Sequence, residues 1–164
     1  MESPDVFVLS RVDWQFWCTF TFKREVPNRV QWSMFRAWVR GLERIASVKP
    51  KRLLWLCRRE CGEIGSRRHL HALVGGLPGW VVTPNRCWHL MYCWRALGGG
   101  HTQIHLYERA LAGVSYALKN LERDGAQQYE ARKFGDKSSA VMLSEGLVAT
   151  LSHRMSALKG GQSR

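Results

Sequence analysis

One short run of the chain constrains its fold more than any other: residues 67–76 read RRHLHALVGG. The alternation predicts a β-strand closed by two glycines. Side chains alternate between the two faces of a strand, so His69 and His71 share one face while the aliphatic residues between and after them share the other. The histidines are then about 6.6 Å apart along the backbone, at ~3.3 Å per residue. Their rings could bind one metal ion, or they could be ordinary surface histidines.

Hydrophobic periodicity along the rest of the chain predicts the other elements. Residues 14–22, WQFWCTFTF, are aromatic and β-branched, which is typical of a strand. Apolar residues recur at helical spacing from Val30 to Ala46, and Pro50 ends that helix. Further strands are predicted at 51–59 and 101–107, further helices from Pro84 to Gly98, at 108–121 and at 144–158, an edge strand at 127–134 and a lead-in at 1–11.

The predicted order is strand-helix-strand-strand-helix-strand, which is the split βαβ arrangement of ferredoxin-like, RRM-like α+β folds. We therefore expect an antiparallel sheet with helices over one face and the other face open. His69 and His71 belong on the open face, because their aliphatic neighbours fill the covered one. No linker divides the chain, so residues 1–164 form one domain with a core at 14–123 and an extension at 127–158.

Charge indicates the kind of partner. The chain has 25 Lys and Arg residues against 13 Asp and Glu residues, a net charge of +12. Such an excess favours a polyanionic partner, most often nucleic acid. No apolar run approaches the ~18 residues of a membrane span, and the N-terminus has no charged-then-apolar signal sequence. We expect a soluble, cytoplasmic protein.

The five cysteines are odd in number and spread through elements that look buried. This pattern argues against a disulfide framework and favours buried reduced thiols. A structural zinc site remains an alternative, although no Cys-x-x-Cys pair occurs. Its ligands would be Cys57, Cys61, Cys87 and Cys93.

Glu60 lies at the end of the strand expected to pair with the histidine strand. A carboxylate beside two imidazoles suits a divalent ion such as Mn²⁺ or Mg²⁺, with open positions for a substrate phosphate. Glu63 is the less favoured alternative ligand. Both acids could instead balance the arginines that surround them in the sequence.

The predicted helix at 108–121 carries a basic stripe opposite its apolar stripe. Arg109, Tyr116, Lys119 and Arg123 share that stripe at helical spacing. A tyrosine beside a lysine one turn away is suited to nucleophilic attack, because the cation lowers the cost of the phenolate. Tyr107 falls on the apolar stripe and is assigned to packing. Taken alone, Tyr116 is more often a surface residue than a nucleophile.

Together these motifs resemble the ordered motif set of HUH endonucleases. The set comprises WCTFTF at 17–22, Glu60, His69-Leu70-His71 and Tyr116-x-x-Lys119. The closest resemblance is to single-tyrosine rolling-circle replication initiators (Rep proteins) of plasmids and single-stranded DNA viruses, and it covers residues 14–123. The chain has no G-x-x-x-x-G-K-[ST] phosphate loop. It therefore resembles a stand-alone nuclease domain, or a piece of a larger protein, that would depend on a host or separate helicase.

The resemblance implies a metal-assisted transesterification on single-stranded DNA in the host-cell cytoplasm, with the substrate exposed at an origin hairpin. His69, His71 and Glu60 would hold one Mn²⁺ or Mg²⁺ ion, and the spacing from Glu60 to His69, about one residue longer than in viral initiators, keeps Glu63 open. Tyr116 would form a 5′-phosphotyrosine, with Lys119 orienting it. The candidate DNA contacts are Arg58, Arg59, Arg67, Arg68, Arg109 and Arg123 for the backbone and Trp17 for base stacking.

Three alternatives stay open at this point. A single-tyrosine transposase of the same superfamily would share the metal and tyrosine chemistry and usually works as a dimer. A non-catalytic RRM-like module would bind nucleic acid without the histidines. A structural zinc protein would depend on the cysteines.

Overall fold

The computed structural model describes residues 4–61, 68–111, 113–117 and 141–160. In chain order the elements are helix α1 (Pro4–Ser10), strand β1 (Trp14–Phe22), helix α2 (Asn28–Ala46), 3₁₀ turn η1 (Pro50–Arg52), strands β2 (Leu54–Cys61) and β3 (Arg68–Gly75), 3₁₀ turn η2 (Gly79–Val81), helix α3 (Pro84–Ala96), strand β4 (Gly99–Leu106), 3₁₀ turn η3 (Arg109–Leu111), helix α4 (Gly113–Ala117), strand β5 (Val141–Leu143) and helix α6 (Glu145–Gly160).

The strands form one antiparallel sheet in the order β4-β1-β3-β2-β5. The first four strands have the ferredoxin-like order, and β5 extends the sheet beside β2. The predicted α+β fold with a split βαβ core is therefore confirmed. The histidine strand β3 is central, between β1 and β2, which fixes the positions of its side chains on both faces.

Helices α2 and α3 cover one face of the sheet and form the larger core with it. Phe20 of β1 is fully buried there, with its ring centroid 4.8 Å from that of Trp38 and 4.6 Å from that of Trp94. Leu70, between the two histidines, is also fully buried in this cluster. Burying one such side chain contributes about 1.5–3 kcal/mol. This burial therefore determines which side chains of β3 face helices α2 and α3 and which face the other side.

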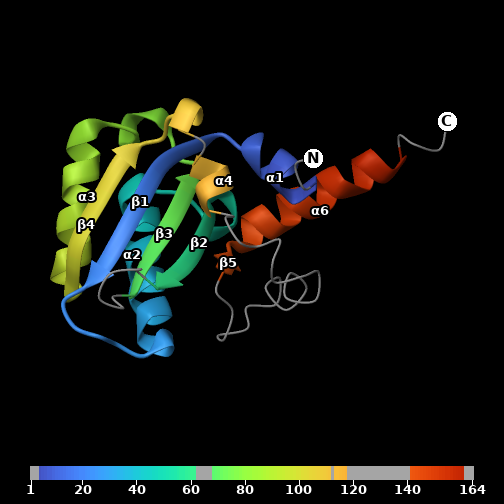
Figure 1. Cartoon of the computed structure of the whole chain (residues 1–164). Helices are drawn as coiled ribbons and strands as arrows, with labels where there is room; N and C mark the ends of the chain where they lie inside the picture. Colours follow the sequence, from blue (N-terminus) through green and yellow to red (C-terminus); the bar gives the residue numbers. More distant parts are fainter. Residues whose placement is uncertain (1–3, 62–67, 112, 118–140, 161–164) are drawn as a thin grey trace.

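The other face is not open, as the sequence analysis expects, but partly covered. Helices α1, α4 and α6 contribute to a second buried cluster that includes Leu56 of β2 and Leu73 of β3. Figure 1 shows α4 in front of the sheet and α2 behind it. The cause is the alternation along the two strands. Leu56 lies on the same face of β2 as Glu60, and Leu73 lies on the same face of β3 as His71, but both leucines are apolar and are buried by the helices. The polar end remains accessible beside the helices.

Several boundaries differ from the predicted ones. The expected lead-in contains α1, and the predicted strand 51–59 begins with η1 and then continues as β2 to Cys61. Glu60 therefore lies within strand β2 rather than just after the predicted strand. The predicted α-helix at 108–121 begins instead with η3. Leu111, four residues after Tyr107 and so on the same predicted apolar stripe, is 73% exposed.

The helices predicted at 30–46, from Pro84 and at 144–158 are confirmed as α2, α3 and α6. The described edge strands are β4 and β5, whereas the predicted edge strand at 127–134 lies outside the described residues. Within the described ranges, every helix is too short or too polar to cross a lipid bilayer.

Candidate metal centre

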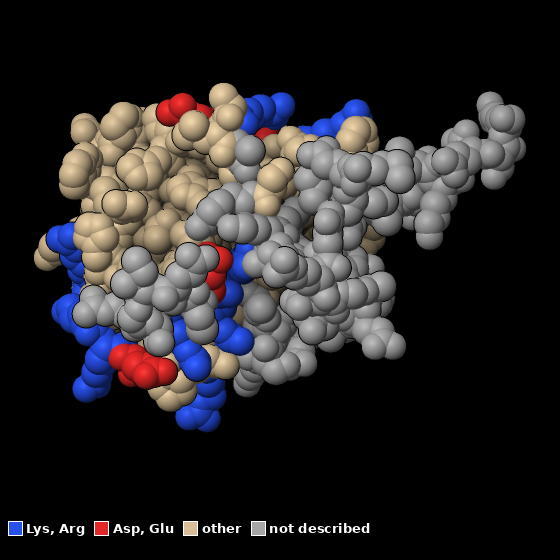
Figure 2. Space-filling view, in the orientation of Figure 1, with Lys and Arg blue, Asp and Glu red and all other residues tan. Residues whose placement is uncertain are grey.

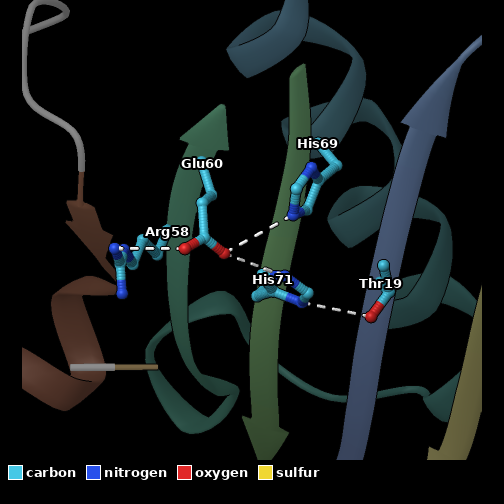
Figure 3. Close-up of polar contacts among 5 residues, drawn as sticks. All are labelled: Thr19, Arg58, Glu60, His69 and His71. Carbon is cyan, nitrogen blue, oxygen red and sulfur yellow. Dashed lines mark hydrogen bonds and ion pairs between the residues drawn. The ribbon is translucent and has the colours of Figure 1, made fainter. Parts of the chain in front are cut away.

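Three predicted metal ligands converge on one face of strands β2 and β3. Glu60 is paired with His69 across the two strands, and His71 lies two residues further along, so all three side chains share a face. Glu60 Oε2 lies 3.4 Å from His69 Nε2 and 3.3 Å from His71 Nε2. Figure 3 shows both rings turned toward the carboxylate. The register of the β2–β3 pair therefore assembles the site.

The spacing and chemistry of these three groups fit a metal ion. Ligand atoms about 2.1 Å from one ion are roughly 3.0–3.4 Å apart in octahedral or tetrahedral geometry, close to the separations observed here. Of the described residues, Glu60, His69 and His71 make up the cluster whose ligand atoms all lie within 4.8 Å of one another. Two imidazoles and one carboxylate suit Mn²⁺ or Zn²⁺ better than Mg²⁺ and leave coordination positions open.

His71 is held in the form that a metal ligand needs. It is 7% exposed, and its Nδ1 lies 3.1 Å from the Thr19 hydroxyl on β1. The Thr19 hydroxyl could accept a proton from Nδ1 when the lone pair of Nε2, on the Glu60 side of the site, binds a metal ion. Burial, assisted by the neighbouring His69, lowers the pKa of His71 from 6.5 to about 4. The imidazole is therefore neutral near pH 7.

Arg58 lies beside the carboxylate rather than on an open surface. Its Nη2 is 3.5 Å from Glu60 Oε1, and the residue is only 9% exposed. This contact engages one carboxylate oxygen and leaves the other facing the histidines (Figure 3). The position suits a residue that orients Glu60, and the predicted contact with a DNA backbone remains a prediction.

The other predicted backbone contacts are dispersed. Arg59 points to the opposite face, where its guanidinium carbon is 5.9 Å from the Trp32 ring centroid. Arg68 Nη1 donates to Asn28 Oδ1 at 2.6 Å, and Arg109 is exposed in η3. The structure does not bring these three side chains together with the metal ligands.

The predicted nucleophile is only partly described. Tyr116 belongs to helix α4, but its side chain lies outside the described residues. Four other predicted residues also lie outside them: Glu63, Arg67, Lys119 and Arg123. The expected continuous stripe from Arg109 to Arg123 is not formed as one α-helix, because η3 ends at Leu111 before α4 begins at Gly113.

A cavity of about 560 Å³ adjoins the metal ligands and extends to the start of α4. Trp17 forms part of its wall and stacks on His71, with ring centroids 5.5 Å apart and an angle of 24° between planes. Gly113 lies close to the rings of Tyr107 and Trp17. A Cβ atom at position 113 would be 2.8 Å from Tyr107 Cε2. The cavity is lined by Trp17, His71, His105, Leu106, Tyr107, Glu108, Leu111 and Gly113.

Six of these lining residues were not predicted as site residues, among them the polar residues His105, Tyr107 and Glu108. Strand alternation could have identified His105 and Tyr107. Both fall on the same side of the sheet as Gln103, whose partner across the strands is Thr19, the residue that contacts His71. Figure 2 shows Lys and Arg gathered along the lower edge of this side of the molecule, and neutral side chains over β1 and β4. The cavity is therefore more apolar than the surface below it.

The cysteines behave as core residues. Cys18, Cys57 and Cys87 are buried, and burial raises the pKa of each thiol, which keeps it protonated. The predicted burial is confirmed for these three, whereas Cys93 is half-buried. The metal-capable cluster in the described part of the chain contains no cysteine; the Cys61 side chain lies outside that part.

Comparison with known proteins finds similarity to a solved structure but to no protein family. No protein-family model matches the chain, and no curated protein matches it. Among solved structures, the chain is similar to the N-terminal nuclease domain of non-structural protein 1 of minute virus of mice, with 11% sequence identity and a TM-score of 0.38 over 87% of this chain and 73% of that domain. That domain coordinates Zn²⁺ in its active-site pocket and recognises DNA at the origin of replication.

Proposed function

We propose that the chain is a metal-dependent DNA endonuclease of the HUH type that nicks and rejoins single-stranded DNA. One observation carries the proposal: the cavity beside the metal ligands is lined both by His71 and by Gly113, three residues before Tyr116. Helix α4 packs on this face, since Val114 and Ala117 share a buried cluster with Leu73. The predicted ligands and the predicted nucleophile thus belong to elements that flank one cavity.

The proposed reaction is a transesterification at a phosphodiester. A divalent ion held by Glu60, His69 and His71 would neutralise charge that develops on the scissile phosphate. The phenol of Tyr116 loses its proton and its oxygen attacks phosphorus. The bond from phosphorus to the 3′ oxygen breaks, and that oxygen takes up a proton. The products are a 5′-phosphotyrosine and a free 3′-OH. Because one phosphate ester replaces another, the step reverses without ATP, and Lys119 would help to stabilise the phenolate.

The cavity would hold a nucleotide next to the scissile phosphate. Its volume is within the range of small-molecule sites, about 300–1,000 Å³. The rings of Trp17 and Tyr107 give surfaces on which a base could stack, which is how single strands are bound without a duplex. The finer proposal is that the enzyme initiates rolling-circle replication of a plasmid or a single-stranded DNA virus, as its motif order resembles that of Rep proteins.

The experiment is a denaturing gel assay with a labelled pool of single-stranded oligonucleotides and Mn²⁺, Mg²⁺ or Zn²⁺. Wild type should give a covalent protein–DNA adduct that depends on metal, and Tyr116→Phe should give none. Tyr92→Phe is the matched control, because Tyr92 is 71% exposed on α3 and should keep full adduct formation. Tight binding with no adduct from wild type would favour a non-catalytic binding module, and an adduct from Tyr116→Phe would assign the nucleophile elsewhere.

A further inference from the structure

Helix α2 carries a stripe of arginines on the side of the molecule away from the metal ligands. Arg29, Arg36 and Arg40, with Ser33 between them, follow at intervals of four, three and four residues, so they lie along one side of the helix. All four are exposed. The stripe is roughly 16 Å long at ~1.5 Å per residue.

These side chains line a pocket of about 250 Å³ whose remaining wall is Trp32. Trp32 is 3% exposed, and its Nε1 is buried without a hydrogen-bond partner among the residues described. A buried indole N–H normally has a partner, because an unsatisfied donor costs free energy. The Arg59 guanidinium lies 5.9 Å from the same ring, on the sheet side. The Nε1 atom is itself buried, so a ligand in the pocket would contact other parts of the Trp32 ring. An acceptor-rich anion in the pocket would meet several guanidinium groups.

The pocket is separate from the metal centre. Trp32 belongs to the core cluster that contains Leu70, whereas His69 and His71 point away from that cluster to the other side of β3. Figure 1 shows α2 behind the sheet and α4 in front of it. A ligand on α2 therefore does not compete for space with a ligand at Glu60.

The chemistry of the pocket selects phosphate esters. Guanidinium groups bind phosphate through paired, charge-assisted hydrogen bonds. Each strand of a DNA duplex has a phosphate about every 3.4 Å along the axis, so a stripe of this length can contact more than one. Sites for single strands add exposed aromatic rings for base stacking, but the Trp32 ring is buried. Charge without a stacking surface is typical of contacts to the backbone of a duplex.

We propose that the pocket formed by Arg29, Trp32, Ser33, Arg36 and Arg40 binds the phosphate backbone of duplex nucleic acid. The chain would then hold a duplex segment on α2 while the opposite face of the sheet holds a single strand. Duplex binding on α2 does not depend on the proposed nuclease activity. The single strand on the opposite face rests on that activity.

The test measures binding of a labelled 20-base-pair duplex by fluorescence anisotropy in EDTA at several salt concentrations. The double variant Arg36→Ala/Arg40→Ala should bind at least about tenfold more weakly and lower the salt slope by about two, at ~0.9 per phosphate contact. Arg95→Ala, which removes an exposed arginine from α3, is the control and should change affinity by less than about threefold.

Two further arms separate the alternatives. The variant His69→Ala/His71→Ala should bind the duplex as wild type does, whether or not it nicks DNA. Duplex binding therefore tests the pocket even if the nuclease proposal fails. Inorganic phosphate alone should bind only in the millimolar range. The proposal is overturned if the double variant binds the duplex as Arg95→Ala does. It is also overturned if micromolar inorganic phosphate occupies the pocket while the duplex does not.

Discussion

At the scale of single residues, the metal centre depends on one hydroxyl outside the ligand set. Thr19 Oγ1 is the contact of His71 Nδ1, at 3.1 Å. Thr19→Val keeps the shape of the side chain and removes the hydroxyl that contacts the His71 ring. We expect about a 10–100-fold loss of metal affinity, the range found when outer contacts of metal-binding histidines are removed.

Isothermal titration with Mn²⁺ and Zn²⁺ measures this loss. Thr21→Val is the matched control, because Thr21 lies on the same strand and donates to the carbonyl of His101 rather than to a ligand. Equal affinities for the Thr19 and Thr21 variants would mean that Thr19 has no role in orienting His71.

The pKa of His71 predicts a pH dependence of stability in metal-free protein. Burial lowers this pKa from 6.5 to about 4, so between these values the unfolded chain binds a proton that the folded chain does not. The free energy of unfolding should fall as pH drops from about 6.5 to about 4. Urea unfolding in EDTA should show a smaller fall for His71→Gln than for wild type. Parallel curves for the two proteins would contradict the assignment.

At the scale of elements, one serine forms hydrogen bonds with both helix α6 and strand β2. Ser144 Oγ accepts from the N–H of Leu147, which caps the helix, and from the N–H of Trp55 on β2, both at 3.1 Å. Ser144→Ala removes both bonds in a buried position. The loss of an N-cap costs about 0.5–2 kcal/mol, or roughly 2–6 °C in Tm for a domain of this size.

Thermal unfolding followed by circular dichroism checks this value. Ser33→Ala, at an exposed position in the middle of α2, is the control and should leave Tm nearly unchanged. If Ser144→Ala unfolds at the wild-type temperature, the docking of α6 does not depend on this serine.

The same elements show what local sequence can and cannot predict. Helix α2 and strand β1 were predictable because their apolar residues follow one period over many positions. The bulge at Gln15 was not, since that side chain leaves the β1 alternation to bond both backbone groups of Leu77, 62 residues away. The alternation of side chains along a strand predicted that His69 and His71 share one face. The contact of His71 with Thr19 depends instead on the register between β1 and β3. Registers arise from packing between distant segments, which periodicity does not encode.

At the scale of the whole molecule, the metal centre joins two adjacent strands of the sheet. Glu60 belongs to β2, and both histidines belong to β3. An ion held by all three binds only the folded chain, so it should stabilise the whole domain by mass action. At a free metal concentration of 100 times Kd, the gain is about 2.7 kcal/mol. For a domain of this length that gain corresponds to a rise in Tm of roughly 5–10 °C.

Thermal unfolding with and without Mn²⁺ or Zn²⁺ tests this coupling without reference to any activity. Glu60→Gln should abolish the rise, because it removes the charged ligand that links β2 to the histidines while keeping the size of the side chain. Glu43→Gln on α2 makes the same change of charge outside the cluster and should keep the full rise. A rise of the same size in Glu60→Gln would mean that the stabilising ion binds elsewhere. The metal-dependent step of the proposed nuclease would then lose its structural basis at this site, even if the chain still binds DNA.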